Sequence, residues 1–519
     1  MARVKLRKSD AKTEFGDFQT PERLAQHMCR LLAGLGVSPA SILEPTCGRG
    51  SILAAALSLF PTATKAIGLE VNGEYAEDAR TRVQGQTPGK IVEVLQGDFF
   101  STEWRPILEN LPDPLLIVGN HPWVTNATLG GLGSENLPVK VNAQQLRGID
   151  ALTGKSNFDI SEWMLRRMLE WVNGRNACIA MLCKTAVARK ILLYGWSRGF
   201  DLLIADIFRI DAAEEFRASV DACLLVMKIG PGDRTRECRD HAIIQEATNS
   251  PTFGYRQGRL VADIAAYEQW KHLEGDEICQ WRSGVKHDCA KVFELQREGT
   301  CYLNGLGERS ELESECLYPM LKGSEVANGT ILYPSRWMLV PQTSIGQETK
   351  PLQMKAPNTW AYLTKNSPLL DARGSRIYRG KPRFSVFGVG DYTFAPWKVA
   401  IAGLYKTLTF RSVGPFQEKP IVFDDTCYFL PCRTEEAALT LCNLLNSEAA
   451  KGFFRAYVFW DAKRPVTIDL LQRLDLIKLA RENNVSVEII ESLRQNLQPR
   501  DNRHRTHKAQ GLLFEEVSR

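Results

Sequence analysis

The residues best suited to chemistry lie in one short turn at residues 117–123, Ile-Val-Gly-Asn-His-Pro-Trp. An apolar strand predicted over residues 115–118 leads into Asn120, His121, Pro122 and Trp123. The turn therefore offers a side-chain amide, backbone carbonyls and a flat aromatic ring. Carbonyl oxygens can accept hydrogen bonds from an exocyclic amine while the ring of Trp123 stacks on a planar base. This combination predicts a site for an amine-bearing base.

A second set of polar residues follows the first three predicted strands. Glu44 precedes a Thr-Cys-Gly-Arg-Gly turn at 46–50, whose glycines let a ligand approach the main chain. Glu70 ends the next strand, where a carboxylate can accept from both ribose hydroxyls. Asp98 ends the third strand and can accept from an adenine amine, with Phe99 beside it for stacking. Each acid alone could be a helix cap or a surface charge, but together they favour S-adenosylmethionine as the ligand. A triphosphate is disfavoured, since the turn has no P-loop lysine.

Alternating strands and helices must position these residues. The predicted strands are 41–45, 66–70, 91–95, 115–118, 176–182, 204–210 and 222–229. Predicted helices cover 52–60, 73–83 and 161–172, the last with apolar residues at helical spacing. Such alternation predicts an α/β fold with a parallel, doubly wound sheet that binds ligands at the carboxyl ends of its strands.

Together these motifs resemble the class I S-adenosylmethionine-dependent DNA adenine-N6 methyltransferases. The similar subgroup has cofactor motifs first, the catalytic Asn-Pro-Pro-aromatic motif next and a target-recognition domain last. Residues 15–21 resemble its extra cofactor motif, with Pro21 at the first position of a helix. Residues 155–160 resemble a motif that borders both the cofactor and the target base. The resemblance implies cofactor contacts from Phe18, Thr20, Pro21, Glu44, Pro45, Thr46, Gly48, Gly50, Glu70, Val71, Asp98, Phe99, Asn120 and Asp159.

The resemblance also implies a mechanism of direct methyl transfer. Hydrogen bonds from the adenine N6 amine to Asn120 Oδ1 and to a backbone carbonyl would raise electron density on the nitrogen and aim it at the methyl group. The base must leave the duplex, and Trp123 would replace its lost stacking. His121 stands where the family has its first Pro. His keeps the backbone carbonyl but loses the fixed φ of Pro. Three interpretations stay open: the site tolerates the substitution, the substitution impairs the site, or the imidazole accepts a proton after transfer.

The second half is interpreted as DNA recognition. Residues 231–251 are predicted to be a linker between a methyltransferase domain at 1–230 and a mixed α/β target-recognition domain at 252–498, with a basic tail at 499–519. Segments 318–326, 382–394 and 461–465 resemble parts of recognition domains in larger members of the family. A run of cations is predicted to contact DNA and comprises Arg373, Arg376, Arg379, Lys381 and Arg383. The alternative is that this run is a solvated basic loop without a binding role.

Composition narrows the class of protein. A chain of 519 residues predicts two or three domains, and 44% hydrophobic with 24% charged residues is ordinary for a globular protein. No apolar run is long enough for a membrane span, and the basic N-terminus lacks the apolar region of a secretory signal. The 13 Cys form no CxxC pair, which predicts reduced thiols in the cytoplasm and no metal site.

Partners and competing functions are also predicted. The expected partner is duplex DNA, and with no nuclease signature in the sequence, any nuclease or defence-system subunits are expected to be separate chains. Such a protein would protect its own DNA in a restriction-modification or phage-defence system. Two alternatives stay open: a methyltransferase acting on cytosine N4, RNA adenine or protein glutamine, and a non-catalytic DNA-recognition subunit with a degenerate catalytic turn.

Overall fold

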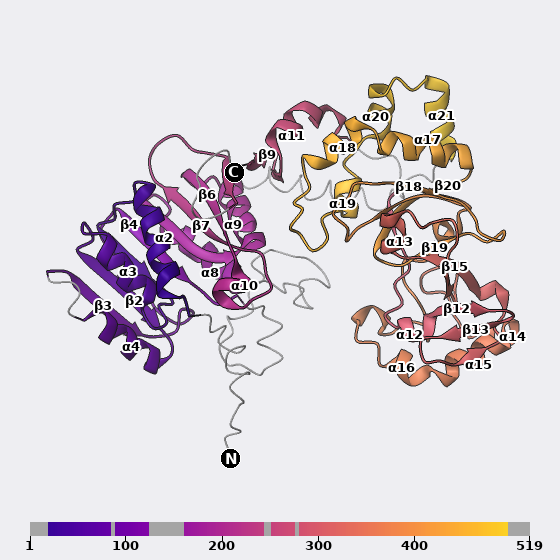
Figure 1. Cartoon of the computed structure of the whole chain (residues 1–519), viewed down its shortest axis with the longest axis horizontal. Helices are drawn as coiled ribbons and strands as arrows, with labels where there is room; N and C mark the ends of the chain where they lie inside the picture. The colour runs from indigo at the N-terminus through magenta and orange to yellow at the C-terminus, as the bar shows by residue number, and fades with distance from the viewer. Residues whose placement is uncertain (1–18, 85–88, 124–159, 243–250, 276–279, 497–519) are drawn as a thin grey trace, which may run out of the picture. The chain divides into compact units, whose positions relative to one another are not determined.

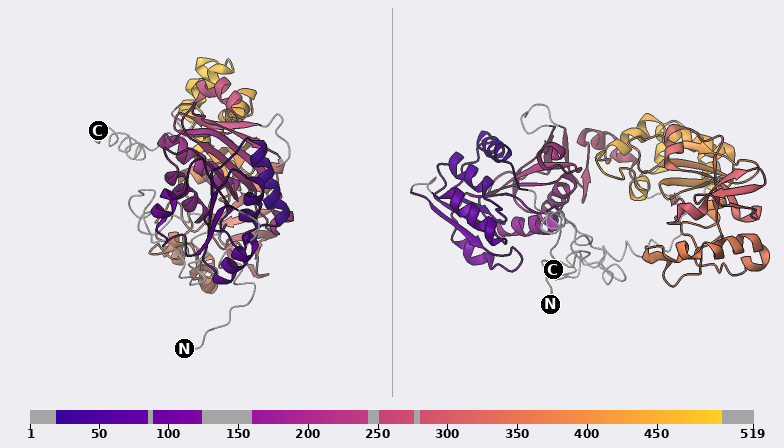
Figure 2. Two further views of the ribbon diagram at one scale, coloured as in Figure 1. Left: turned by 90° about the vertical axis from the view of Figure 1, so that its left-hand side faces the viewer. Right: turned by 60° about the horizontal axis from the view of Figure 1, so that its bottom comes forward.

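The structure is a computed structural model that describes residues 19–84, 89–123, 160–242, 251–275 and 280–496. The predictions for Phe18, Asp159 and the tail at 499–519 lie outside the described residues. The chain divides into two compact units, Met1–Ile264 and Ala265–Arg519. Figure 1 shows the first in indigo to magenta and the second in pink to yellow, and Figure 2 gives two further views.

The first unit is built from alternating strands and helices. Its helices are α2 (Glu22–Gly34), α3 (Ser51–Leu59), α4 (Gly73–Val83), α5 (Trp104–Glu109), α8 (Ile160–Trp171), α9 (Thr185–Arg198) and α10 (Ala212–Phe216). Its strands are β1 (Ser41–Glu44), β2 (Lys65–Glu70), β3 (Ile91–Gln96), β4 (Leu115–Asn120), β5 (Ala177–Lys184), β6 (Leu202–Ile210), β7 (Ala222–Ile229), β8 (Glu237–His241), β9 (Thr252–Arg256) and β10 (Arg259–Val261). The predicted α/β class is therefore confirmed for this unit.

The ten strands form one sheet in the order β10-β9-β8-β6-β7-β5-β4-β1-β2-β3. Strands β1 to β5 are mutually parallel, as predicted. The prediction of a parallel sheet does not extend to β7, which pairs antiparallel with both β5 and β6. A hydrophobic run indicates that a strand is buried but not its direction, so the sequence pattern could not distinguish the two cases.

Helices cover both faces of this sheet. One core cluster joins α2, α3 and α4 to side chains such as Leu116 and Val118, which share one face of β4. Helices α8 and α9 contact each other and strand β5. The alternate β4 residues Leu115 and Ile117 are fully buried but absent from the first cluster, so they point to the opposite face. The parallel strands are thus buried on both sides.

The predicted linker at 231–251 is not a simple connection. Strand β8 lies within it and pairs with β6, and β9 follows through its pairing with β8. The first compact unit accordingly extends to Ile264, beyond the predicted boundary at residue 230. Strand β8 is polar, and a buried ion pair holds it in the sheet. The buried carboxylate of Asp206 in β6 accepts two hydrogen bonds from Arg239 of β8, at 2.6 and 2.7 Å.

The second unit mixes short strands and helices. A four-stranded sheet has the order β11 (Arg282–Ser283), β20 (Cys427–Cys432), β17 (Trp397–Ala402), β18 (Arg411–Val413). A six-stranded sheet has the order β14 (Arg309–Ser310), β13 (Cys301–Asn304), β12 (Glu294–Glu298), β16 (Arg336–Leu339), β15 (Leu317–Leu321), β19 (Val422–Phe423). The helices are α11 (Ile264–Trp270), α12 (Ala290–Phe293), α13 (Gly323–Asn328), α14 (Leu352–Lys355), α15 (Pro357–Lys365), α16 (Ser367–Asp371), α17 (Glu435–Leu445), α18 (Glu448–Arg455), α19 (Ile468–Leu471), α20 (Leu476–Glu482) and α21 (Val487–Asn496).

Candidate active site

The carboxyl edge of the sheet in the first unit gathers the predicted site residues. Strand β1 lies between β2 and β4, so successive connections wind away from it in opposite directions. This is the topological switch point at which open α/β sheets bind ligands. Glu44 ends β1, Glu70 ends β2 and Asn120 ends β4. A Cβ added to Gly119 would lie 3.4 Å from Glu44 Cγ, which shows how closely the ends of β1 and β4 approach.

The turn after β1 needs its two glycines. Gly48 has φ of +52° and Gly50 has φ of +76°, both in the left-handed region that favours glycine. A Cβ on Gly48 would lie 2.7 Å from Gln19 Oε1, and one on Gly50 would lie 3.0 Å from the Cα of Ala79. The turn is therefore a close-packed backbone cradle at the start of α3.

Glu70 ties this cradle to the neighbouring strands. Its Oε2 accepts from the Gly48 N–H at 2.9 Å, and its Oε1 accepts from the Asn72 N–H at 2.8 Å. Its backbone carbonyl accepts from the Gly97 N–H at 2.9 Å, which sets the turn that carries Asp98. An ionised carboxylate has about four acceptor positions, so Glu70 retains capacity for ligand hydroxyls.

Glu44 is a buried carboxyl group, only 2% exposed. Burial raises its pKa well above the ordinary value, and the nearby Glu70 raises it further, although the Leu53 backbone N–H opposes both. Among the described residues, none donates a hydrogen bond to Glu44 Oε2. A buried acceptor without a donor is costly, and a cationic ligand group would satisfy it. The site therefore has the character required to bind an ammonium group.

A short strap formed by Gln19 and Thr20 joins the cradle to Asn120 in the predicted catalytic turn. Gln19 Oε1 accepts from the Arg49 N–H at 3.1 Å, and the Thr20 carbonyl accepts from Ser51 Oγ at 2.8 Å. Thr20 Oγ1 accepts from Asn120 Nδ2 at 3.2 Å. The strap thus fixes the orientation of the Asn120 amide relative to the glycine turn. Pro21 precedes the helix, which begins at Glu22, one residue later than predicted.

In the rest of the predicted catalytic turn, His121 and Trp123 are buried and Pro122 is half-buried. His121 is 2% exposed and Trp123 is 5% exposed. The Trp123 indole donates to the Leu182 carbonyl at 3.3 Å and packs edge-to-face against Phe216, with ring centroids 5.2 Å apart. The Lys184 ammonium donates to the Trp123 carbonyl at 2.8 Å. The Trp123 ring, predicted to stack on a base, therefore packs against protein side chains in this structure.

Comparison with known proteins identifies the family. No family model matches the chain. The Type II methyltransferase M.NspV of Nostoc sp. (strain ATCC 29411 / PCC 7524) is 45% identical over 471 residues, which is 91% of this chain and 98% of the relative. The chain belongs to the Type II methyltransferases. A solved structure of the Type IIL restriction-modification enzyme MmeI in complex with DNA matches with a TM-score of 0.53 at 13% identity, over 89% of this chain and 66% of that one. At that identity the second match shows a shared fold.

An aromatic cluster supports the Asp98 turn of this Type II methyltransferase. Phe99 is 5% exposed, and its ring lies 5.1 Å from Trp104 and 5.4 Å from Trp171. The Trp104 indole donates to the Phe99 carbonyl at 2.8 Å. Phe99 was predicted to stack beside Asp98, but in the structure its ring packs among protein side chains. The Phe100 N–H donates to Asp98 Oδ1 at 3.1 Å and so orients that carboxylate.

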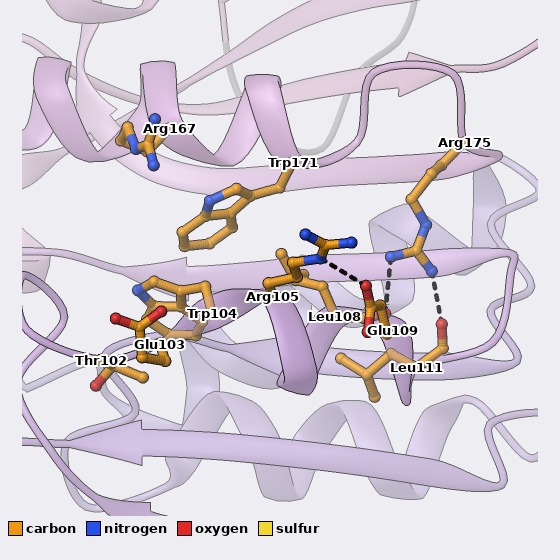
Figure 3. A pocket seen from close by; sticks show the side chains of 10 residues that line it. All are labelled: Thr102, Glu103, Trp104, Arg105, Leu108, Glu109, Leu111, Arg167, Trp171 and Arg175. Carbon is orange, nitrogen blue, oxygen red and sulfur yellow. Dashed lines mark hydrogen bonds and ion pairs between the residues drawn. The ribbon is translucent and has the colours of Figure 1, made fainter.

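A cavity of about 680 Å³ lies beside this cluster, with the side chains of Trp104 and Trp171 in its wall (Figure 3). Two arginines in the cavity wall form ion pairs with nearby acids. Arg105 pairs with Glu109 at 2.8 Å, and Arg175 pairs with Asp113 at 2.6 Å. Leu111 and Arg175 precede strands β4 and β5, so the cavity extends toward the amino edge of the sheet, away from Asn120.

The remaining residues predicted to bind the cofactor or DNA differ in how far they are exposed. Pro45 is buried, Thr46 is half-buried and Val71 is 41% exposed. In the second unit, four of the five predicted DNA-binding cations are exposed, whereas Arg373 is half-buried and donates to backbone carbonyls. Sequence reasoning missed Gln19 as part of the strap, and Phe216 and Lys184 as the supports of Trp123. Phe216 lies in segment 211–221, which follows the predicted strand 204–210. Because that segment begins at the carboxyl end of a strand, its position could have indicated that Phe216 lies near the predicted site.

Among the described residues, no helix is long and apolar enough to span a membrane. Within the same part of the chain, no group of three or more His, Cys, Asp or Glu side chains is arranged to hold a metal ion.

Proposed function

We propose that this Type II methyltransferase transfers a methyl group from S-adenosylmethionine to adenine N6 in duplex DNA, for self-DNA protection in a restriction-modification or phage-defence system. The observation that carries the proposal is the convergence of a buried, unsatisfied carboxyl oxygen on Glu44 with Asn120 at the ends of two adjacent parallel strands. The Thr20 side chain joins Asn120 to the same cradle.

The cradle suits S-adenosylmethionine, which supplies an electrophilic methyl group when bound. Glu44 Oε2 would bind the ammonium group of its amino-acid end. Glu70 would accept from the ribose hydroxyls, and Asp98 from the adenine amine. The glycines at 48 and 50 let the ligand lie directly against the backbone. The chain thus binds three chemically different parts of one molecule along one sheet edge.

Asn120 would position the target amine. Its Nδ2 is engaged by Thr20, which directs Oδ1 toward the other side of the amide. That oxygen and a backbone carbonyl of the turn would accept the two N6 hydrogens, increase electron density on nitrogen and align its lone pair for in-line transfer. The product proton can leave to water, so the residues carry catalysis by positioning and electrostatics without a covalent enzyme intermediate.

The acceptor is proposed to be a base in DNA. The resemblance of residues 120–123 to an adenine-N6 motif favours adenine, and the solved MmeI structure of shared fold contains DNA. An adenine in a duplex must rotate out of the stack to reach Asn120. The planar ring of Trp123 would then contact the base, once the packing against Phe216 opens.

The test is transfer of a labelled methyl group from S-adenosylmethionine to duplex DNA, followed by nucleoside analysis. Label in N6-methyladenine is expected, whereas label in N4-methylcytosine, or none in DNA but some in RNA or protein, would contradict the proposal. We expect Asn120→Ala to reduce the rate of methyl transfer at least about 100-fold, which is the loss typical of removing one oriented hydrogen-bonding group. The affinity for the cofactor should be nearly unchanged. Asn173→Ala, at an exposed position after α8, is the matched control and should keep full activity.

A further inference from the structure

One guanidinium closes the neck of a loop in the second unit. Arg373 Nε donates to the Leu370 carbonyl at 2.8 Å, and Arg373 Nη1 donates to the carbonyls of Ser385, at 2.8 Å, and His287, at 3.2 Å. The side chain therefore ties both ends of segment 374–384 to each other and to a neighbouring strand connection. A segment of this length with its ends held together has the character of an Ω-loop.

Tyr378 attaches the loop to the rest of the second unit. The Arg373 guanidinium lies 3.8 Å from the centroid of this ring, within cation–π range. The Tyr378 hydroxyl donates to the Lys286 carbonyl at 3.2 Å, and its ring packs edge-to-face on Phe387 at 5.4 Å. The 3₁₀ turn at Arg376–Tyr378 is thereby attached to the body of the unit.

The far end of the loop is anchored in a strained conformation. Phe384 has φ of +66°, a left-handed value that is unusual for an aromatic residue. The residue is 1% exposed, and its ring meets Trp360 edge-to-face at 5.4 Å, so burial maintains the strain. The buried Gln342 amide also binds the backbone N–H and carbonyl of Val386, both at 3.2 Å.

The charges on this loop divide into two groups. No acidic residue occurs from 372 to 390. Arg373 is engaged internally, consistent with a pKa lowered by burial, and Arg383 pairs with Asp371 at 2.7 Å. The other three cations of the segment are exposed: Arg376, Arg379 and Lys381. The loop thus has a rigid base and exposed cations.

We propose that segment 374–384 is a preformed loop that binds DNA phosphates through Arg376, Arg379 and Lys381, while Arg373 is a positioning residue that never contacts DNA. The inference rests on the proposed function in taking duplex DNA as the partner. Phosphates are favoured over bases as the contact, because both aromatic side chains of the loop, Tyr378 and Phe384, pack against the rest of the unit and the exposed side chains are cations. A loop ordered before binding loses less conformational entropy when DNA arrives.

The first test measures DNA affinity against salt concentration, with the full chain, S-adenosylhomocysteine and a fluorescent duplex that contains a methylated site. The triple variant Arg376→Gln, Arg379→Gln, Lys381→Gln should bind at least tenfold more weakly. The slope of log affinity against log salt should fall by about 0.9 for each lost phosphate contact. All three changes are on the surface and should leave folding intact. The matched control removes three exposed charges from the first unit, in the variant Arg30→Gln, Arg198→Gln, Arg234→Gln.

The second test separates positioning from contact. Arg373→Lys keeps the charge but lacks the planar fork that donates from two separate nitrogens to three carbonyls, so it should weaken DNA binding nearly as much as Arg373→Met. A direct phosphate contact would instead survive in the lysine variant. In the triple-variant background, Arg373→Met should cause no further loss of affinity, since it acts through the absent cations.

The outcomes are distinguishable from failure of the proposed function. An unchanged slope and affinity in the triple variant overturns the loop proposal even if adenine methylation is observed. Additive losses on combining Arg373→Met with the triple variant overturn the positioning role. Salt-dependent loss of DNA binding without any N6-methyladenine would leave the loop proposal standing and refute the proposed reaction.

Discussion

At the scale of single residues, Glu44 is the group whose state depends most on what binds beside it. Its carboxyl is buried, its pKa is raised chiefly by burial, and Oε2 lacks a donor among the described side chains and backbone groups. A group with a raised folded-state pKa adds stability below its unfolded pKa, and that stability is lost as pH rises through the folded value. A bound cation would reverse the shift, because it favours the ionised form.

We therefore expect Glu44→Gln to weaken binding of S-adenosylhomocysteine about 10- to 100-fold, the loss of one hydrogen bond to a charged group. The ligand-free variant should be at least as stable as the wild type above pH 7, since the ionisable group is gone. Calorimetric titration and thermal unfolding check the two parts. The affinity of the wild type should also fall with decreasing pH, while that of the variant should not. Unchanged affinity in Glu44→Gln would remove this residue from the cofactor site.

At the scale of elements, several boundaries followed from local pattern. Helix α4 at Gly73–Val83 and strand β7 at Ala222–Ile229 match the predicted ranges, because capping and apolar runs are local properties. Strand β8 was missed because charged residues interrupt its five positions, and only the partner Asp206 makes Arg239 acceptable in the sheet. Local capping also separates α17 from α18, since the Ser447 side chain accepts from the Ala450 N–H and begins a new helix.

The Asp98 turn depends on α5 for its position. Trp104 begins this helix, donates to the Phe99 carbonyl and packs on Trp171 with ring centroids 4.6 Å apart. Trp104→Phe keeps an aromatic ring but leaves that buried carbonyl without its donor. We expect the KM for S-adenosylmethionine to rise about 3- to 10-fold with kcat at saturating cofactor nearly unchanged. Steady-state kinetics measures both, and Trp397→Phe, at a half-buried position of β17 in the second unit, is the matched control. A fall in kcat alone would contradict this positioning role.

At the scale of the whole molecule, each compact unit buries an ionisable side chain, Glu44 in the first unit and Lys398 in the second. In the second unit Lys398 is 1% exposed, and burial lowers its pKa to about 7. Its amine donates to the carbonyls of Ala395, at 2.6 Å, and Ile421, at 2.9 Å, two partners for the two hydrogens of a neutral amine. Between pH 7 and the ordinary lysine pKa, the unfolded chain binds more protons than the folded one, so the free energy of unfolding increases with pH.

Lys398 should therefore make the protein more stable at pH 9 than at pH 7, by at most about 1.4 kcal/mol per pH unit from this group. Lys398→Met removes the titration and retains much of the volume. The difference in unfolding midpoint between wild type and variant, followed from pH 6 to 9, isolates the contribution from other groups. A difference that stays constant across that range would show that the amine remains charged.

Local chemistry in the chain was sufficient to indicate the α/β class, the glycine turn and the candidate residues Glu44, Glu70 and Asn120, because strand periodicity and turn composition depend on near neighbours. Long-range contacts settled the rest. The direction of β7, the burial of Trp123 against Phe216 and the internal role of Arg373 all depend on partners distant in sequence, such as the His287 carbonyl that Arg373 binds. A basic run looks the same in sequence whether its cations face solvent or backbone carbonyls, and only packing distinguishes the two.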